Sequence, residues 1–174
     1  MIYFITNKTH NIINSLDNEE IIIINNMSKL NEFINDKIKN NNLEIGYDLE
    51  TTGLDAYKNE ILLIIIGDKE TKFVIDYTTN IKFDDEFNIF HTLNHYKFTF
   101  IGHNIKFDWK FTKTKLNIEL EKCYDTMLVE QRLYANYDLP NDLASVVTRY
   151  FEILPKEMNK SIRLEFINAK RNPG

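Results

Sequence analysis

Cysteine, proline and glycine are scarce in this sequence of 174 residues. It has one cysteine, Cys123, with three prolines and five glycines. A lone cysteine cannot form an internal disulfide, so we expect a reducing, cytoplasmic setting. Apolar residues still make up 43% of the chain, which is enough for a core and excludes wholesale disorder. The length predicts a single domain over residues 1–174.

Long hydrophobic runs are also missing. The longest unbroken one is Ile61–Ile66, whereas a membrane-spanning helix needs about 20 apolar residues. The first residues, MIYFITNKTHN, have no basic head before their apolar stretch and no small-residue cleavage site, so they do not indicate a signal peptide. The sequence therefore predicts a protein with no membrane partner.

An excess of positive charge is missing too. The 21 basic residues stand against 26 acidic ones, and the net charge is -5. This balance argues against a protein that coats nucleic acid through bulk positive charge. Basic residues do outnumber acids between residues 106 and 115 and from residue 149 onward. Each of these runs is either a solvated surface or a local contact with a charged partner.

The spacing of apolar residues predicts an α/β fold. Strands are expected over residues 20–25, 44–50, 61–67, 71–77 and 97–101, and before Tyr124. Helices are expected from Ser28, as an N-cap, to 38, over 83–93, from about 104, after 125, and from Pro140 to 151. The closely spaced strands over 44–77 indicate an antiparallel meander, and strand–helix alternation follows. This order is typical of a mixed sheet flanked by helices.

Two carboxylates in the segment IGYDLETTGLD are the most informative residues. Asp48 and Glu50 are two apart on a predicted strand, so both project from the same face. Their neighbours Ile45, Tyr47 and Leu49 point to the other side. Like charges in such a place repel each other, and a divalent cation between them removes the difficulty. The alternative is a strand with a solvated outer face.

The residues that follow form a predicted glycine turn. Thr51, Thr52 and Gly53 leave the strand next to the carboxylates. Such a turn is expected to expose backbone N–H groups and two hydroxyls, which suit phosphate oxygens. The alternative for Gly53 is an ordinary turn.

A second informative segment is FIGHNIKFDWKF. Asn104 and Asp108 are four apart and share one face of the helix expected there. Phe107 is expected off that face, packed inward. Taken alone, these residues are typical of a helix cap and a surface acid, and His103 is typical of a structural histidine.

Together the segments resemble the DnaQ-like, or DEDD, 3'–5' exonucleases, whose fold is ribonuclease H-like. Their D-x-E motif, commonly followed by T-T-G-L, is matched by residues 48–54, and their H-N-x-x-F-D motif by residues 103–108. A further D-T-M-L helix start is matched by residues 125–128. The chain looks most similar to the proofreading domains of family A DNA polymerases and to ribonuclease D.

The resemblance implies a role for each matching residue. Asp48, Glu50 and Asp108 would be the catalytic carboxylates that bind Mg2+ or Mn2+. Two such ions would activate a water and stabilise the leaving 3' oxygen. The residues implied to contact a single-stranded DNA 3' end are Thr51, Thr52, Leu54, His103, Asn104 and Phe107. Asp125 is expected to cap its helix, and Lys106 and Lys110 to face the substrate backbone.

The family's third motif is the main departure. It supplies a fourth carboxylate as Y-x-x-x-D or H-x-x-x-x-D on a late helix. Tyr134 and Asp138 have the first spacing, but we interpret them as a helix end and a loop. We therefore expect a domain cut short before its last catalytic helix, which needs a companion chain or a downstream segment of a DNA polymerase.

The sequence is compatible with more than one function. The leading hypothesis is a metal-dependent 3'–5' exonuclease domain acting on DNA, as the proofreading part of a polymerase. One alternative is a catalytically weak module of the same fold that binds nucleic acid or a partner protein. Another is an RNA-directed exonuclease similar to ribonuclease D.

Overall fold

The computed structural model describes residues 1–8, 15–16, 19–79 and 84–151. The chain falls into two compact units, Met1–Asp125 and Thr126–Gly174. Position 83 and the basic residues after 151 lie outside the described residues. In the described helices, none combines the length and the hydropathy of a membrane span.

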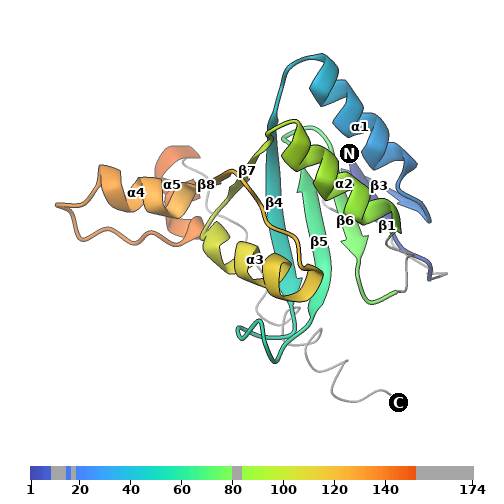
Figure 1. Ribbon diagram of the computed structural model, residues 1–174. Helices are drawn as coiled ribbons and strands as arrows, with labels where there is room; N and C mark the ends of the chain where they lie inside the picture. Colours follow the sequence, from blue (N-terminus) through green and yellow to red (C-terminus); the bar gives the residue numbers. More distant parts are fainter. Residues whose placement is uncertain (9–14, 17–18, 80–83, 152–174) are drawn as a thin grey trace. The chain divides into compact units, whose positions relative to one another are not determined.

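A mixed sheet runs through the first unit (Figure 1). Its strands are β1 (Ile2–Ile5), β2 (Ser15–Leu16), β3 (Glu19–Ile24), β4 (Glu44–Thr51), β5 (Ile61–Gly67), β6 (Lys72–Asp76), β7 (Thr99–Gly102) and β8 (Cys123–Asp125). They are ordered β2-β3-β1-β6-β5-β4-β7-β8. Strands β4, β5 and β6 form an antiparallel meander, whereas β7 joins β4, and β8 joins β7, in parallel. The predicted α/β mixed sheet, a meander followed by strand–helix alternation, is confirmed.

The helices of the first unit are α1 (Ser28–Lys39), α2 (Asp84–His95) and α3 (Ile105–Phe111), which continues into the π-helical turn η1 (Thr112–Leu116). The second unit contains α4 (Thr126–Leu133) and α5 (Leu143–Phe151). Most predicted elements are therefore present with bounds shifted by a few residues. Strand β1 was not predicted, because four residues at the start of a chain show too little periodicity.

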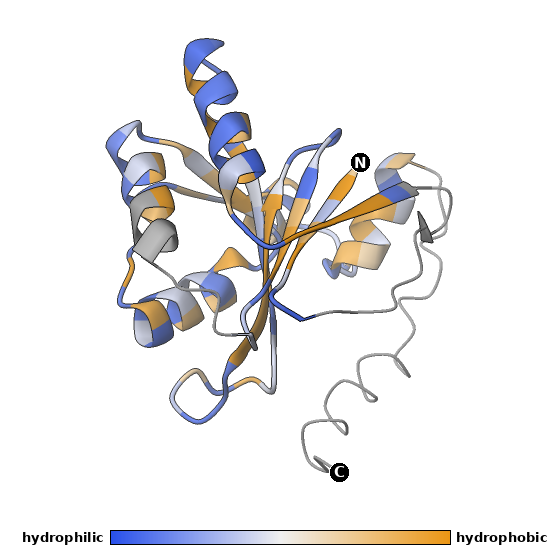
Figure 2. Ribbon diagram, turned by 90° about the vertical axis from the view of Figure 1, so that its right-hand side faces the viewer, coloured by the Kyte–Doolittle hydropathy of each residue, from blue (hydrophilic) through white to orange (hydrophobic). Residues whose placement is uncertain are grey.

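The hydrophobic core lies on one face of the sheet. Tyr47, Ile66 and Phe73 are cross-strand partners and therefore point to the same side. On that side Phe90 of α2 packs edge-on against Tyr47, with ring centroids 5.9 Å apart, and Phe33 of α1 packs against Phe73 at 5.3 Å. Figure 2 shows the hydrophobic colour concentrated along the central strands. Burial against this face is what fixes α1 and α2 to the sheet.

Two helix starts differ from the predictions. Ser28 is the first residue of α1, and Met27 occupies the N-cap position without a side-chain cap bond. Asn26 Oδ1 accepts the Ser28 N–H bond at 3.0 Å. Helix α5 begins at Leu143, after Pro140. Asp142 caps it, since its carboxylate accepts the N–H of Ser145 at 3.0 Å and the hydroxyl at 2.6 Å. Proline has no side-chain acceptor for this task.

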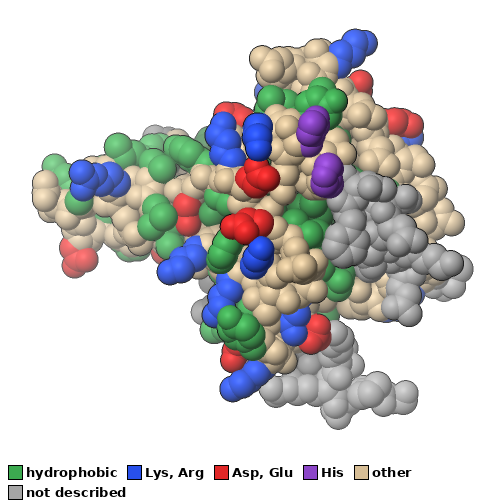
Figure 3. Space-filling model, viewed as in Figure 1, with side chains coloured by type: hydrophobic (Ala, Val, Ile, Leu, Met, Phe, Trp, Pro, Cys, Tyr) green, Lys and Arg blue, Asp and Glu red, His purple; other side chains and the backbone are tan. Residues whose placement is uncertain are grey.

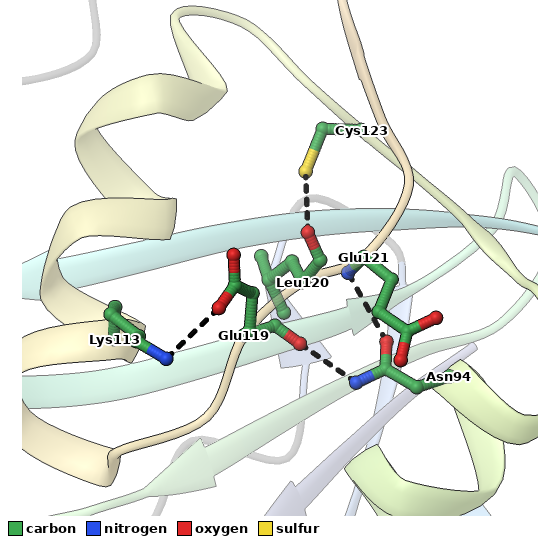
Figure 4. A network of polar contacts seen from close by, with 6 residues as sticks. All are labelled: Asn94, Lys113, Glu119, Leu120, Glu121 and Cys123. Carbon is green, nitrogen blue, oxygen red and sulfur yellow. Dashed lines mark hydrogen bonds and ion pairs between the residues drawn. The ribbon is translucent and has the colours of Figure 1, made fainter.

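A polar network holds the segment that leads into β8 (Figure 4). Asn94, at the end of α2, donates to the carbonyl of Glu119 at 2.7 Å and accepts the N–H of Glu121 at 3.3 Å. Lys113 of η1 forms an ion pair with Glu119 at 2.9 Å. Strand β8, which ends at Asp125, is thereby fixed beside β7.

Candidate active site

Strand β4 carries two of the predicted carboxylates on its solvent side. Ile45, Tyr47 and Leu49 are buried, whereas Asp48 is exposed and Glu50 is half-buried. The predicted alternation is therefore confirmed. It places both carboxylates on the face opposite the core.

The third carboxylate, Asp108, contacts β4 beyond the point where β7 stops pairing with it. Strand β7 pairs with Glu44, Ile45 and Gly46 only as far as its own Ile101. The chain then turns at Gly102, where a Cβ would lie 3.0 Å from the Tyr47 carbonyl oxygen. Helix α3 follows, and Asp108 Oδ1 accepts the Leu49 N–H bond at 3.0 Å. Asp108 thus binds the backbone amide that lies between Asp48 and Glu50.

Two hydroxyls hold the helix in that position. Thr112 Oγ1 donates to the Asp108 carbonyl oxygen at 2.8 Å. Because that bond uses the only proton of the Thr112 hydroxyl, Tyr47 donates its own hydroxyl proton to Thr112 Oγ1, also at 2.8 Å. The core face of β4 therefore anchors the helix that carries Asp108.

Asp108 is an acid in an unfavourable place. Its exposed fraction is 3%. Burial first, and the negative charge of Asp48 second, raise the pKa of Asp108 to about 7, although the Leu49 N–H bond opposes the rise. A buried carboxylate that faces another carboxylate is stabilised by a hard divalent cation. The donor set therefore fits Mg2+ or Mn2+.

Over the described ranges, no three side chains of the His, Cys, Asp and Glu types come together as a metal-binding group. Asp48 and Asp108 interact electrostatically, and Glu50 lies on the same strand as Asp48. The roles of all three as catalytic metal ligands stay predictions.

The turn after β4 differs from its expected form. The Thr51 hydroxyl donates to the Gly53 carbonyl oxygen at 2.7 Å, and Thr52 makes two hydrogen bonds with the backbone of Glu60. The Thr52 N–H donates to Glu60 O, and the Thr52 hydroxyl accepts the Glu60 N–H, each at 2.9 Å. The expectation of free groups is wrong for the Thr51 hydroxyl proton and the Thr52 N–H, because both close the loop. The Thr52 hydroxyl accepts in its bond with Glu60 and can still donate its proton. A Cβ at position 53 would lie 2.7 Å from the Asn59 side chain, which would have to move.

The second motif forms the start of α3 as predicted. Asn104 adopts a left-handed conformation, with φ 62° and ψ 40°, and its carbonyl oxygen accepts the Phe107 N–H bond at 2.9 Å. Its own N–H donates to Asp125 Oδ1 at 2.9 Å. Phe107 packs inward against Phe111, with ring centroids 4.9 Å apart. Asp125 therefore links β8 to the second motif, and its role as the cap of α4 stays a prediction.

Other predicted substrate contacts occupy varied positions. His103 is half-buried, and Leu54 is 85% exposed on the loop between β4 and β5. Lys106 and Lys110 are exposed on α3. Their contacts with a nucleic acid stay predictions, as do those of Thr51, Thr52, Asn104 and Phe107.

The second unit has no third-motif geometry at Tyr134 and Asp138. Helix α4 ends at Leu133, and both residues follow it, Asp138 in the exposed loop before α5. Tyr134 instead lies under Arg149, whose guanidinium is 5.1 Å from the ring centroid. Arg149 also forms an ion pair with the buried Glu130. The interpretation of Tyr134 and Asp138 as a helix end and a loop is confirmed.

The fold and the site define the class of protein. A family described as 3'-5' exonuclease matches residues 21–170. The chain therefore belongs to the 3'–5' exonuclease family, and the predicted membership of the DEDD exonucleases is confirmed. Enzymes of this family use divalent metal ions. No curated protein matches the chain.

Solved structures share the ribonuclease H-like fold. NrnC from Brucella melitensis is 18% identical, with a TM-score of 0.55, and 64% of this chain aligns with 53% of that one. The catalytic core of RRP6 from Trypanosoma brucei is 15% identical, with a TM-score of 0.60, and 88% of this chain aligns with 35% of that one. RNase D from Escherichia coli is 15% identical, with a TM-score of 0.52, and 80% of this chain aligns with 42% of that one. The chain thus spans about half the length of NrnC and less of the other two.

Proposed function

We propose that the chain is a metal-dependent 3'–5' exonuclease domain that hydrolyses the terminal phosphodiester of single-stranded DNA, as the proofreading part of a DNA polymerase. The observation that carries this proposal is the bond between Asp108 and the Leu49 amide. That bond connects the second motif to the backbone between Asp48 and Glu50. Family membership supports the reaction, because the matched family is described as 3'-5' exonuclease.

The chain's own residues hold charge and orient the substrate in this proposal. Asp48, Glu50 and Asp108 bind Mg2+ or Mn2+, which when bound supplies an activated water and stabilises the leaving oxygen. Leu54, His103 and the start of α3 position the terminal nucleotide. A solved structure of Brucella melitensis NrnC has Mg2+ bound, and another is bound to pGG. Both support the proposal that this chain binds a metal ion and a nucleotide.

RNA is the second candidate substrate. The Escherichia coli RNase D structure is described as that of an exoribonuclease involved in structured RNA processing. Its similarity to this chain favours RNA as much as the polymerase resemblance favours DNA. The 2'-hydroxyl is the group that distinguishes RNA from DNA at such a site.

Three substrates of one sequence test the proposal. Linear single-stranded DNA, the same strand as a circle, and the matching RNA are incubated with the protein in Mn2+ or in EDTA. The proposal expects metal-dependent loss of the linear DNA and an intact circle, because the enzyme needs a free 3' end. Faster digestion of RNA would assign the second candidate. Cleavage of the circle would contradict an exonuclease.

A companion segment is a further part of the proposal. In the described helices, no Y-x-x-x-D pair is present, because Tyr134 and Asp138 lie after α4. A missing orienting group can lower a rate by orders of magnitude. We therefore propose that the chain binds a 3' end but cleaves slowly until a polymerase segment or companion chain supplies that motif. Equal rates with and without such a segment would contradict this.

A further inference from the structure

Two large apolar side chains stand out on the loop between β4 and β5. Leu54 is 85% exposed and Tyr57 is 74% exposed. The resemblance already assigns Leu54 to the terminal nucleotide. Tyr57 has no role in the site described so far, although it follows the first motif by only a few residues.

Hydrogen bonds hold the backbone of the loop around Tyr57. Asp55 Oδ1 accepts the Tyr57 N–H bond at 3.0 Å, and Asn59 Oδ1 accepts the Asp55 N–H bond at 3.1 Å. Between them, Ala56 is fully buried and anchors the loop to the core. A tyrosine side chain has only two rotatable dihedrals, so it loses little conformational entropy when a ligand stacks on it.

A lysine from the second motif's helix lies over the ring. Lys110 Nζ is 5.3 Å from the centroid of the Tyr57 ring, and Lys110 is two residues after Asp108. A second link between the same elements is the ion pair of Lys115 with Glu60, at 2.9 Å. The aromatic ring and the ammonium group are therefore held together beside both catalytic motifs.

We propose that Tyr57 and Lys110 form an upstream contact for a single-stranded nucleic acid. The base of a nucleotide one or a few positions before the 3' terminus stacks on Tyr57, and the ammonium of Lys110 faces a neighbouring phosphate. Base stacking on aromatic rings next to a cation is how proteins bind single strands without reading sequence. This proposal rests on the proposed function and names the part of the substrate that the carboxylates do not hold.

The charge balance of the chain favours such a local contact. The net charge is -5, and on the face in Figure 3 basic and acidic side chains are interspersed. A broad basic surface is therefore not what attracts the strand on that face. Stacking contributes affinity that does not depend on bulk positive charge.

Binding of a 5'-fluorescein single strand with a free 3' end, measured by anisotropy in Ca2+, tests the proposal. Tyr57→Ala should weaken binding by about tenfold, and Tyr57→Phe should restore most of it, because the phenyl ring still stacks. Lys110→Gln should weaken binding and lower its dependence on salt. The control is Tyr96→Ala, which removes an exposed tyrosine at the end of α2 and should leave binding unchanged.

Oligonucleotides with one abasic site at successive positions identify the stacked base. The wild type should lose affinity when the missing base is the one that stacks, and Tyr57→Ala should not respond at that position. Equal affinities of the wild type and Tyr57→Ala, or the same abasic profile for both, would overturn the proposal. Thermal melting of each variant separates a lost contact from lost folding.

Asp48→Ala separates this proposal from the proposed function. Suppose that the wild type binds 3' ends and that Asp48→Ala loses the cation-dependent part of this binding. If Tyr57→Ala then binds like the wild type, the proposed function stands and only the stacking contact fails. If the wild type shows no cation-dependent binding of 3' ends, the proposed function fails and the stacking contact fails with it.

Discussion

Asp108 is the residue whose charge the fold opposes most. Its pKa of about 7, against an ordinary value of 3.8, results from burial and then from Asp48. A carboxyl with a raised pKa binds its proton more tightly in the folded state. The stability that this proton contributes is present below about pH 4 and is lost as the pH rises towards 7. In the metal-free protein Asp108 therefore lowers stability at neutral pH.

Asp108→Asn should remove this dependence. The amide oxygen keeps an acceptor for the Leu49 N–H, and the variant carries no charge. We expect it to be more stable than the wild type at pH 8 by roughly 3–4 kcal/mol, and less so at pH 5. Urea unfolding in EDTA at both values measures the difference. Asp138→Asn, in an exposed loop, is the control, and a pH-independent difference for Asp108→Asn would contradict the account.

Glu50→Gln should reduce the nuclease rate by orders of magnitude with little change in melting temperature. The substitution keeps the shape of the side chain and removes its charge, so that it no longer suits a hard cation. Steady-state rates on linear DNA in Mn2+ measure the loss. Glu44→Gln changes an exposed glutamate of the same strand and should keep the full rate. Equal rates for the two variants would exclude Glu50 from the site.

At the scale of elements, strand β4 and helix α3 depend on each other through Thr112. Thr112→Val keeps the volume but leaves the buried Tyr47 hydroxyl without its acceptor. We expect a loss of about 1–3 kcal/mol of stability and a lower nuclease rate, because Asp108 is no longer held in place. Thermal melting and rates measure both effects. Thr114→Val, at a half-buried position of the same turn, should change neither. A full rate for Thr112→Val would show that the anchor does not position Asp108.

Helices and strands could be predicted where the pattern of residues that defines them lies within one short segment. The period-two alternation around Asp48 fixed the faces of β4, and the spacing of Asn104 and Asp108 predicted α3. The bond from Asp108 to Leu49 joins residues 59 positions apart, so no local pattern could show it. The pairing of Tyr57 with Lys110 was missed for the same reason.

Turns and caps were predicted less well because several side chains can satisfy the same backbone group. Met27 occupies the N-cap position that was expected for Ser28, with Asn26 accepting the Ser28 N–H bond, and Asp142 caps the helix that was expected to start at Pro140. At the turn after β4, Thr52 closes the loop through Glu60. The sequence therefore indicates which kinds of side chain form caps and turns, but their hydrogen-bond partners depend on the folded chain.

For the whole molecule, a bound cation should stabilise the folded state. Millimolar Mn2+ or Mg2+ is expected to raise the melting temperature. A cation concentration of one hundred times the dissociation constant adds about 2.7 kcal/mol to the free energy of unfolding. Asp48→Ala should abolish the shift while keeping or raising the metal-free stability, because it relieves repulsion with Asp108. Differential scanning fluorimetry measures both values. A variant that kept the full shift would place the cation elsewhere.

The direction of digestion tests the central claim most directly. A 5'-labelled single strand is incubated with the protein in Mn2+, alone and with a segment that carries Y-x-x-x-D, and its length is followed on a sequencing gel. The account predicts a ladder that shortens one nucleotide at a time, is absent in EDTA and is lost in Glu50→Gln. Internal fragments at the earliest times, the same ladder from Glu50→Gln, or no shortening under either condition would contradict it.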